Sequence, residues 1–232
     1  AAEIKVKLDG RAFVNGARVH AHDNDTFACI SPLDGQKLID VARCKQADVD
    51  AAVKVARVAF EDGRWAHLSP KKRKETLIKF ADLIVTNAHE LAVTETLDMG
   101  KPVSNALAVD VNAAQNTIRW FGEAIDKVYD EVAPTPRDSL ALITREPVGV
   151  VAAVVPWNYP LLMTSWKIAP ALATGNSVIL KPSEKSPLTA LRLAELALEA
   201  GIPAGVFNVL PGYGHEAGAA LAEHMDVDCV AF

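Results

Sequence analysis

Hydrophobic positions in the second half of the chain form short β-branched runs that alternate with longer helical stretches. Residues 148–155 are an apolar run, bounded by glycine and proline, that is too short for a helix of ordinary length. Such a run predicts a strand buried on both faces. An apolar helix is expected over residues 161–173, ended by Gly175, and a second buried strand over residues 177–180. Together these segments predict one βαβ unit.

The same alternation continues along the chain. A leucine- and alanine-rich stretch predicts a helix over residues 188–200, followed by a strand over residues 206–210. A short helix is expected over residues 217–224 and a fourth strand over residues 228–232. Four strands separated by three helical crossovers predict an α/β fold, a Rossmann-like parallel sheet with flanking helices. Open sheets of this kind bind ligands beyond the carboxyl ends of their strands.

The first half of the chain reads as extended segments followed by helices. Residues 3–43 have an extended pattern, and Asn15-Gly16 is a strong hairpin signal. Helices are expected over residues 48–60, from the Ser69-Pro70 start onward, over residues 89–99 and over residues 103–125. The last of these helices is expected to carry Trp120 and Phe121 toward the core.

Residues 131–146 have a different character, with prolines in a turn followed by alternating polar and apolar positions. This pattern predicts an exposed β-ribbon. Because an isolated two-stranded ribbon is marginally stable, we expect it to pair with another segment or another subunit.

Composition and charge narrow the function classes. The 232 residues are half apolar and 23% charged, with a net charge of −5. That balance is typical of globular proteins and disfavours nucleic-acid binding. The run Lys71-Lys72-Arg73-Lys74 is compatible with a nucleic-acid or lipid patch, but an acidic protein favours a solvated helix face. The apolar runs are shorter than the ~20 residues that span a bilayer. The N-terminal sequence AAEIKVKLDG lacks the pattern of a secretory signal.

Three cysteines stand apart from one another, with no CxxC spacing and no even count. This usage favours a reducing compartment, so we expect a cytoplasmic protein with no disulfide framework and no metal site. Cys229 is expected in a buried strand, Cys29 in an N-terminal strand and Cys44 at a strand-to-helix junction. None of these positions predicts a reactive thiol.

Polar residues follow both strands of the first βαβ unit. Lys181, Ser183 and Glu184 come directly after the second strand, where a carboxylate can accept both hydroxyls of a ribose and an ammonium can donate to one. The alternative is a surface ion pair of little energetic worth. Asn158, in a turn between prolines, can donate an amide N–H to developing negative charge. The alternative is a turn residue that bonds its own backbone.

A glycine turn follows the third strand, with Gly212, Gly214 and Gly218. The spacing is not GxGxxG, and glycines at such a place can serve close packing alone. Gly214 and Gly218 nevertheless open a helix, whose N-terminal amides suit a diphosphate.

Two long segments, VVPWNYPLLMTSWKIAPALATGNSVILKPSE and VFNVLPGYGHEAGAALAEHMDVDCVAF, closely resemble the aldehyde dehydrogenase family. The Ser69-Pro70 helix start and ETLDMGKP extend the resemblance over almost the whole chain. Within the family, FGEAIDKVYDEVAPTP looks most like the bacterial γ-glutamyl-γ-aminobutyraldehyde dehydrogenases, which oxidise amino-aldehydes in polyamine breakdown.

The resemblance implies roles for individual residues. Asn158 matches the catalytic asparagine that stabilises the oxyanion. The implied cofactor-binding residues are Val154, Val155, Pro156, Trp157, Lys181, Ser183, Glu184, Gly214 and Gly218. The implied wall of the aldehyde tunnel consists of Tyr159, Met163 and Trp166, while Lys167 matches a lysine near the active site whose role stays open. Asp110 either faces an amine-bearing substrate near the tunnel mouth or is a solvated helix residue, which is the favoured interpretation.

The resemblance also implies an activity and a domain organisation. The activity is NAD(P)-dependent oxidation of an aldehyde through a thiohemiacetal and a thioester, by a homodimer or homotetramer that contacts neither membrane nor nucleic acid. NAD is expected rather than NADP, because a carboxylate at the ribose repels a 2′-phosphate. Residues 1–128 and 147–232 would belong to the dinucleotide-binding domain, and residues 129–146 to an oligomerisation ribbon.

The family's threonine-glycine-serine turn, catalytic cysteine and general-base glutamate would all follow the last residue of this sequence. We therefore expect the N-terminal part of an enzyme, inactive by itself. One alternative is a non-catalytic dinucleotide-binding or interaction module. A second is a related acyl-phosphate or semialdehyde reductase, against which Glu184 argues.

Overall fold

The computed structural model describes residues 6–232, so positions 3–5 of the predicted extended region lie outside the described residues. A six-stranded sheet forms its centre, in the order β10-β7-β8-β9-β1-β2. Strands β7 (Val150–Val154), β8 (Ser177–Lys181), β9 (Phe207–Val209) and β10 (Cys229–Ala231) run parallel. The predicted α/β fold with a mostly parallel sheet is confirmed.

The strand order reverses beside β7. The chain passes from β7 to β8 to β9 in one direction and then returns, so that β10 pairs with the other side of β7. In open parallel sheets the connections on the two sides of such a reversal leave a crevice beyond the strand ends, and ligands bind there. The segment that follows β7 therefore opens at this crevice.

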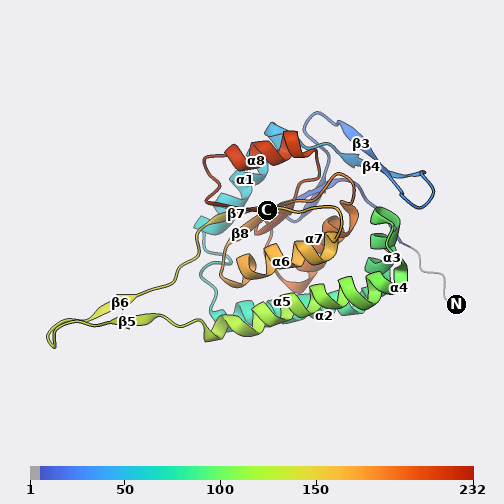
Figure 1. Cartoon of the computed structure of the whole chain (residues 1–232). Coiled ribbons are helices and arrows are strands. Elements are labelled where there is room, and N and C mark those ends of the chain that lie inside the picture. The colour runs from blue at the N-terminus through green and yellow to red at the C-terminus, as the bar shows by residue number, and fades with distance from the viewer. Residues whose placement is uncertain (1–5) are drawn as a thin grey trace.

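Helices cover both faces of the sheet (Figure 1). On one face, α1 (Gln46–Glu61) and α8 (Ala219–Glu223) pack with alternate residues of β7 in one hydrophobic cluster. On the other face, α6 (Pro160–Ala173) and α7 (Leu188–Ala200) pack with the intervening residues, and α2 (Pro70–Thr86) and α5 (Asn112–Ala124) pack outside α6 and α7. Strand β7 is thus buried on both faces, as its apolar run predicts.

Two hairpins precede the helices. Strands β1 (Ala12–Val14) and β2 (Ala17–Val19) are joined by Asn15 and Gly16, both with positive φ, as the Asn-Gly signal predicts. Strand β1 also pairs antiparallel with β9, which extends the central sheet. Strands β3 (Thr26–Ile30) and β4 (Lys37–Ala42) form a separate two-stranded sheet.

The helix expected over residues 103–125 has this extent but is not uniform. It consists of α4 (Val103–Asn105), the π-helical turn η1 (Ala106–Val111), α5 and the 3-10 turn η2 (Ile125–Lys127); α3 (Ala88–Met99) precedes it. The expectation that it carries Trp120 into the core is wrong, because 61% of Trp120 is exposed. Ile118 and Gly122 lie on the buried face, and Trp120 projects between them from the opposite side. Phe121 is half-buried and packs against the core.

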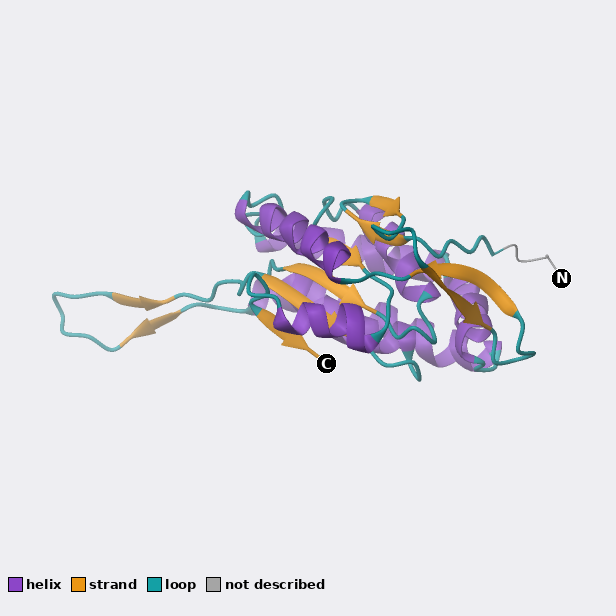
Figure 2. Cartoon of the chain, turned by 90° about the horizontal axis from the view of Figure 1, so that it is seen from above, coloured by secondary structure: helices purple, strands orange, loops and turns teal. Residues whose placement is uncertain are grey.

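The predicted ribbon is present as β5 (Glu131–Ala133) and β6 (Ala141–Ile143), which project away from the body of the molecule (Figure 2). Its large apolar side chains Val132, Leu140, Leu142 and Ile143 are all exposed. The division of the chain after residues 128 and 146 stays a prediction.

Within residues 6–232, no helix has both the length and the apolar character needed to cross a membrane. In the same part of the chain, no group of three or more His, Cys, Asp or Glu residues is arranged to hold a metal ion.

The basic run at the start of α2 contains one structural cation. Ser69 caps the helix by accepting a hydrogen bond from the Lys72 N–H. Arg73 is 8% exposed and donates to the carbonyl of Ala173 at 3.0 Å, to that of Ala66 at 3.1 Å and to that of Leu68. Arg73 therefore ties α2 to the C-terminal end of α6.

We expect Arg73→Met to lower the free energy of unfolding by about 3 kcal/mol, because it leaves buried carbonyls without donors. Urea unfolding of the intact protein, followed by tryptophan fluorescence, measures the change. The exposed neighbour provides a matched control, since Lys72→Met should change stability by less than about 0.5 kcal/mol. Equal effects of the two substitutions would contradict the structural role of Arg73.

Candidate functional site

Two segments meet at the carboxyl edge of the sheet. Val154, the last residue of β7, pairs with Lys181, the last residue of β8, and the Val155 N–H donates to the Lys181 carbonyl at 3.1 Å. The turn that follows β7 carries Pro156, Trp157, Asn158 and Tyr159, all exposed. The structure thus brings the predicted turn and the predicted Lys181–Glu184 segment to the same edge.

Lys181 and Glu184 do not form an ordinary surface ion pair. Lys181 is only 2% exposed, its Nζ donates to the Pro182 carbonyl at 2.7 Å, and it lies 3.7 Å from Oε2 of Glu184. Burial lowers the pKa of Lys181, and the charge of Glu184 opposes that shift. Glu184 itself is about one-third exposed. A buried ammonium is thus placed beside a carboxylate that ligands can reach.

Ser183 supports this segment from within. It is buried, and its Oγ accepts a hydrogen bond from the Lys185 N–H at 3.2 Å, which holds the turn that presents Glu184. A direct contact of Ser183 with a cofactor stays a prediction.

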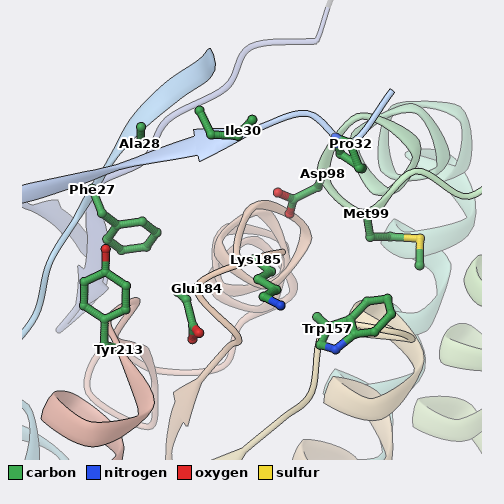
Figure 3. Close-up of a pocket in the computed structure, with 10 residues that line it drawn as sticks. All are labelled: Phe27, Ala28, Ile30, Pro32, Asp98, Met99, Trp157, Glu184, Lys185 and Tyr213. Atoms are coloured by element: carbon green, nitrogen blue, oxygen red, sulfur yellow. The ribbon is translucent and has the colours of Figure 1, made fainter. Parts of the chain in front are cut away.

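A cleft of about 390 Å³ opens beside Glu184 (Figure 3). The Glu184 carboxylate and the Lys185 ammonium face it between the rings of Tyr213 and Trp157. Strand β3, the turn that follows it and the end of α3 line the rest, with Phe27, Ala28, Ile30, Pro32, Asp98 and Met99. Phe27 packs on Tyr213 with ring centroids 5.4 Å apart. Sequence reasoning missed all of these except Trp157 and Glu184; only Tyr213, inside the glycine turn, had a local signal.

The three glycines of that turn have different surroundings. A Cβ on Gly212 would lie 2.7 Å from the Cys44 carbonyl oxygen, so close packing requires glycine there. A Cβ on Gly214 would meet nothing within 4 Å, and one on Gly218 would lie 3.4 Å from Cδ of Lys181. Close packing therefore does not explain Gly214, which begins the π-helical turn η3 (Gly214–Gly218) with open space beside it.

The predicted aldehyde wall is divided between surfaces. Trp166 lines a second cleft of about 520 Å³ between α5 and α6, together with Asn116, Thr117, Trp120 and Phe121. Met163 is half-buried and packs against the main core. Tyr159 is 41% exposed in the turn. Sequence reasoning missed Trp120 as a lining residue because it placed that ring in the core.

The three thiols have unreactive or remote positions. Burial raises the pKa of Cys29, and Asp98 adds to the shift; burial raises the pKa of Cys44 as well. Neither residue is suited to form a thiolate at neutral pH. The expectation that Cys229 is buried is wrong, because β10 is an edge strand and leaves it exposed. Cys229 starts β10, whereas the two segments meet beyond the opposite strand ends.

Asp110 contradicts both interpretations of the sequence. It is fully buried in η1, and its Oδ1 accepts a hydrogen bond from the Lys101 Nζ at 2.6 Å. Asp110 therefore neither faces solvent nor offers a free carboxylate to an amine, because Lys101 already supplies the cation.

Glu95 lies under the start of α6. It is fully buried, and its Oε1 accepts a hydrogen bond from the Leu161 N–H at 3.3 Å. Burial raises the pKa of Glu95 to about 8, and the nearby Asp110 and Asp98 add to the shift. At neutral pH the Glu95 carboxyl group is therefore protonated in most molecules.

A mostly parallel sheet whose strand order reverses, with a cleft beyond its carboxyl edge, is the arrangement of a dinucleotide-binding domain. The model of the aldehyde dehydrogenase family matches residues 19–232, and the chain belongs to that family. The predicted family membership is confirmed.

Relatives make the position within the family more specific. The chain is 55% identical to the NADP/NAD-dependent aldehyde dehydrogenase PuuC of Escherichia coli, over 99% of this chain and 46% of PuuC. The Pseudomonas syringae indole-3-acetaldehyde dehydrogenase AldA, a mutant solved in complex with NAD+ and IAA, is 63% identical with a TM-score of 0.96, over 97% of this chain and 46% of that one. The γ-glutamyl-γ-aminobutyraldehyde dehydrogenase of Burkholderia cenocepacia is 58% identical with a TM-score of 0.96, over 98% and 46%. The chain thus spans about half the length of the relatives it matches.

We expect Glu95→Gln to flatten the pH dependence of stability. The folded-state pKa of about 8 lies above that of an unfolded glutamate, so the folded state retains the proton more tightly. Its contribution to stability is therefore complete below pH ~4.5 and is lost as the pH rises toward 8, at no more than about 1.4 kcal/mol per pH unit.

Urea midpoints of the intact protein between pH 5 and pH 8 measure this slope. Glutamine keeps the acceptor for the Leu161 N–H but does not titrate. The stability of the variant should therefore fall less steeply between pH 5 and pH 8 than that of the wild-type protein. Glu199→Gln, on an exposed surface of α7, is the matched control. A decline that is identical in all three proteins would show that Glu95 does not hold the proton.

Proposed function

We propose that this chain serves in the NAD-dependent oxidation of an aldehyde to its carboxylic acid. The single observation that carries the proposal is the edge where the turn with Asn158 meets the Lys181–Glu184 segment beside a cleft. That edge offers an amide donor, an ammonium and a carboxylate within one region. Family membership supports the same conclusion.

The cleft beside Glu184 suits the adenosine half of a dinucleotide. The partly exposed carboxylate can accept the two ribose hydroxyls, and the Lys181 ammonium, 3.7 Å away, can donate to one of them. The rings of Trp157 and Tyr213 flank the same space. The open surroundings of Gly214 leave room for a diphosphate at the start of η3. A bound nicotinamide supplies the hydride acceptor.

Asn158 serves the substrate end of the site. Its exposed amide can donate a hydrogen bond to the oxygen that becomes negatively charged when a thiolate attacks the aldehyde carbon. The nucleophilic thiol and the general base are proposed to lie outside these 232 residues. Cys29 and Cys44 are buried with raised pKa values, and the exposed Cys229 begins β10, away from the carboxyl ends of the strands. The 232-residue chain by itself is then inactive.

The substrate is proposed to be an amino-aldehyde or a γ-glutamylated amino-aldehyde of polyamine breakdown. Relatives named as a γ-glutamyl-γ-aminobutyraldehyde dehydrogenase and an aminoacetaldehyde dehydrogenase support this choice. The cleft of Trp120, Phe121 and Trp166 supports it independently, since aromatic faces attract ammonium groups.

The proposal also covers the domain organisation, the oligomeric state and the cellular location of the protein. Residues 129–146 would form the oligomerisation ribbon of a homodimer or homotetramer, and the exposed apolar side chains of β5 and β6 support this role. The rest of the chain would form the dinucleotide-binding domain. The cytoplasm is the proposed location, because isolated cysteines suit a reducing compartment.

Asn158→Ala in the intact protein is expected to lower kcat for aldehyde oxidation at least about a hundredfold, as removal of one oxyanion donor does. Steady-state production of NADH measures the effect. Asn112→Ala, which removes an exposed amide from α5, is the matched control and should leave kcat within about twofold. Near-normal turnover in Asn158→Ala would refute the assigned role. An intact wild-type protein that oxidises no aldehyde would instead favour a non-catalytic dinucleotide-binding module.

Cofactor preference provides a second test. We expect a higher kcat/KM with NAD than with NADP, because the Glu184 carboxylate repels a 2′-phosphate. Glu184→Gln should reduce the ratio of the two efficiencies by about tenfold, the effect of roughly 1.4 kcal/mol of repulsion. The E. coli relative is named for both cofactors, so a ratio and not an exclusion is expected. Equal efficiencies in the wild-type protein would count against the assignment.

A further inference from the structure

A buried ion pair lies behind the turn that carries Asn158. Lys101 follows Gly100, which ends α3 in a left-handed conformation, and Asp110 lies in the π-helical turn η1. The Lys101 Nζ is 2.6 Å from Oδ1 of Asp110, and the two side chains are 14% and 0% exposed. Oδ2 of Asp110 is buried without a hydrogen-bond partner among the described residues.

Stability alone does not account for this pair. Removing two charges from water costs about as much as their attraction returns, and well-packed apolar residues often serve equally well. A buried carboxylate oxygen without a donor adds to the cost. The carboxylate also lies in a π-helical turn, a distortion that is frequent at functional sites. These features indicate that the pair does something other than stabilise the fold.

The ammonium has a second neighbour. Its Nζ lies 3.9 Å from the centroid of the Tyr159 ring, which is the distance of a cation–π contact. Tyr159 directly follows Asn158 and occupies the N-cap position of α6, with extended φ and intermediate ψ. Lys101 therefore contacts the residue adjacent to the proposed oxyanion donor.

The rest of the turn is fastened at both ends. The Trp157 carbonyl accepts a hydrogen bond from Oγ of the buried Ser186 at 3.3 Å. Leu161 contributes the first free N–H of α6, because Pro160 has none, and this N–H donates to Glu95. Between these two hydrogen bonds, the Lys101 ammonium contacts the ring of Tyr159. The pair with Asp110 lets a cation do this without adding net charge to the site.

We propose that Lys101, held by Asp110, is a positioning residue that fixes the Asn158 amide through the Tyr159 ring. The inference rests on the proposed function, since it matters for turnover only if Asn158 stabilises the oxyanion. Displacement of a catalytic group by about 1 Å can cost on the order of a hundredfold in rate. A loosened turn should therefore slow the chemical step and leave the distant ribose contacts intact.

The test replaces both partners of the ion pair in the intact protein. Lys101→Met together with Asp110→Asn removes the ammonium without leaving a buried carboxylate unpaired. We expect kcat at saturating aldehyde to fall about tenfold, while the NAD dissociation constant, measured by tryptophan fluorescence, changes less than twofold. Lys72→Met, on an exposed face of α2, is the matched control for loss of a lysine charge.

Two further variants separate positioning from general weakening of the fold. Lys101→Arg retains a cation over the ring and should recover most of kcat. In a Tyr159→Leu background, the Lys101→Met/Asp110→Asn change should have no additional effect, because its target ring is absent. If the pair replacement does not fold, Tyr159→Leu alone carries the test, with an expected tenfold fall in kcat at unchanged NAD affinity.

The results separate the two proposals. An unchanged kcat in the pair replacement, no recovery with Lys101→Arg, or an equal fall in the Tyr159→Leu background would overturn the positioning role. So would an unchanged kcat in Tyr159→Leu alone. These outcomes leave the proposed function standing as long as Asn158→Ala lowers kcat by about a hundredfold or more. Normal turnover in Asn158→Ala would remove the proposed function itself.

Discussion

The site depends on the parallel pairing of β7 with β8. Val154 is the partner of Lys181, and the Val155 N–H reaches the Lys181 carbonyl across the same end of the pair. Because side chains alternate along a strand, a slip of one residue would turn Lys181 to the other face and exchange the side chains of β8 between the two hydrophobic clusters. Hydrophobic clusters on the two faces of β7 hold the register. The two buried strands β7 and β8 therefore align the two polar segments that follow them.

The strand order reverses beside β7, one of the two strands whose ends carry the polar segments. The turn after β7 lies at this edge, where strand β3 and the end of α3 line one side of the cleft. Glu184 faces that cleft between two aromatic rings, and the Lys181 ammonium lies 3.7 Å from its carboxylate. Membership of the aldehyde dehydrogenase family agrees with this arrangement.

Local chemistry explains which parts of the fold the sequence predicts. The parallel strands follow from apolar runs, the first hairpin from Asn15-Gly16, and the start of α2 from Ser69-Pro70. The pairing of β1 with β9 rests on contacts between Phe13 and Val209, which are too distant in sequence for any local pattern to show.

The same distinction holds for the site. Glu184 is predicted from its place after a strand and Trp157 from the family resemblance, whereas Phe27 reaches the cleft from a hairpin more than a hundred residues earlier. Asp110 is misread because burial and a lysine partner are properties of the packed structure, and a helical period does not reveal a π-helical turn. Trp120 is misread because aromatic character alone does not tell which side of a helix meets the core.

The projecting ribbon has a consequence for how the protein behaves in dilute solution. Its outer edges offer unsatisfied amides and carbonyls, and its apolar side chains face water. Under the proposed oligomerisation role, a second copy of the chain would cover the ribbon only in its folded form, so mass action would make the melting temperature climb with protein concentration. Such a protein would have a larger free energy of unfolding in a concentrated sample than in a dilute one.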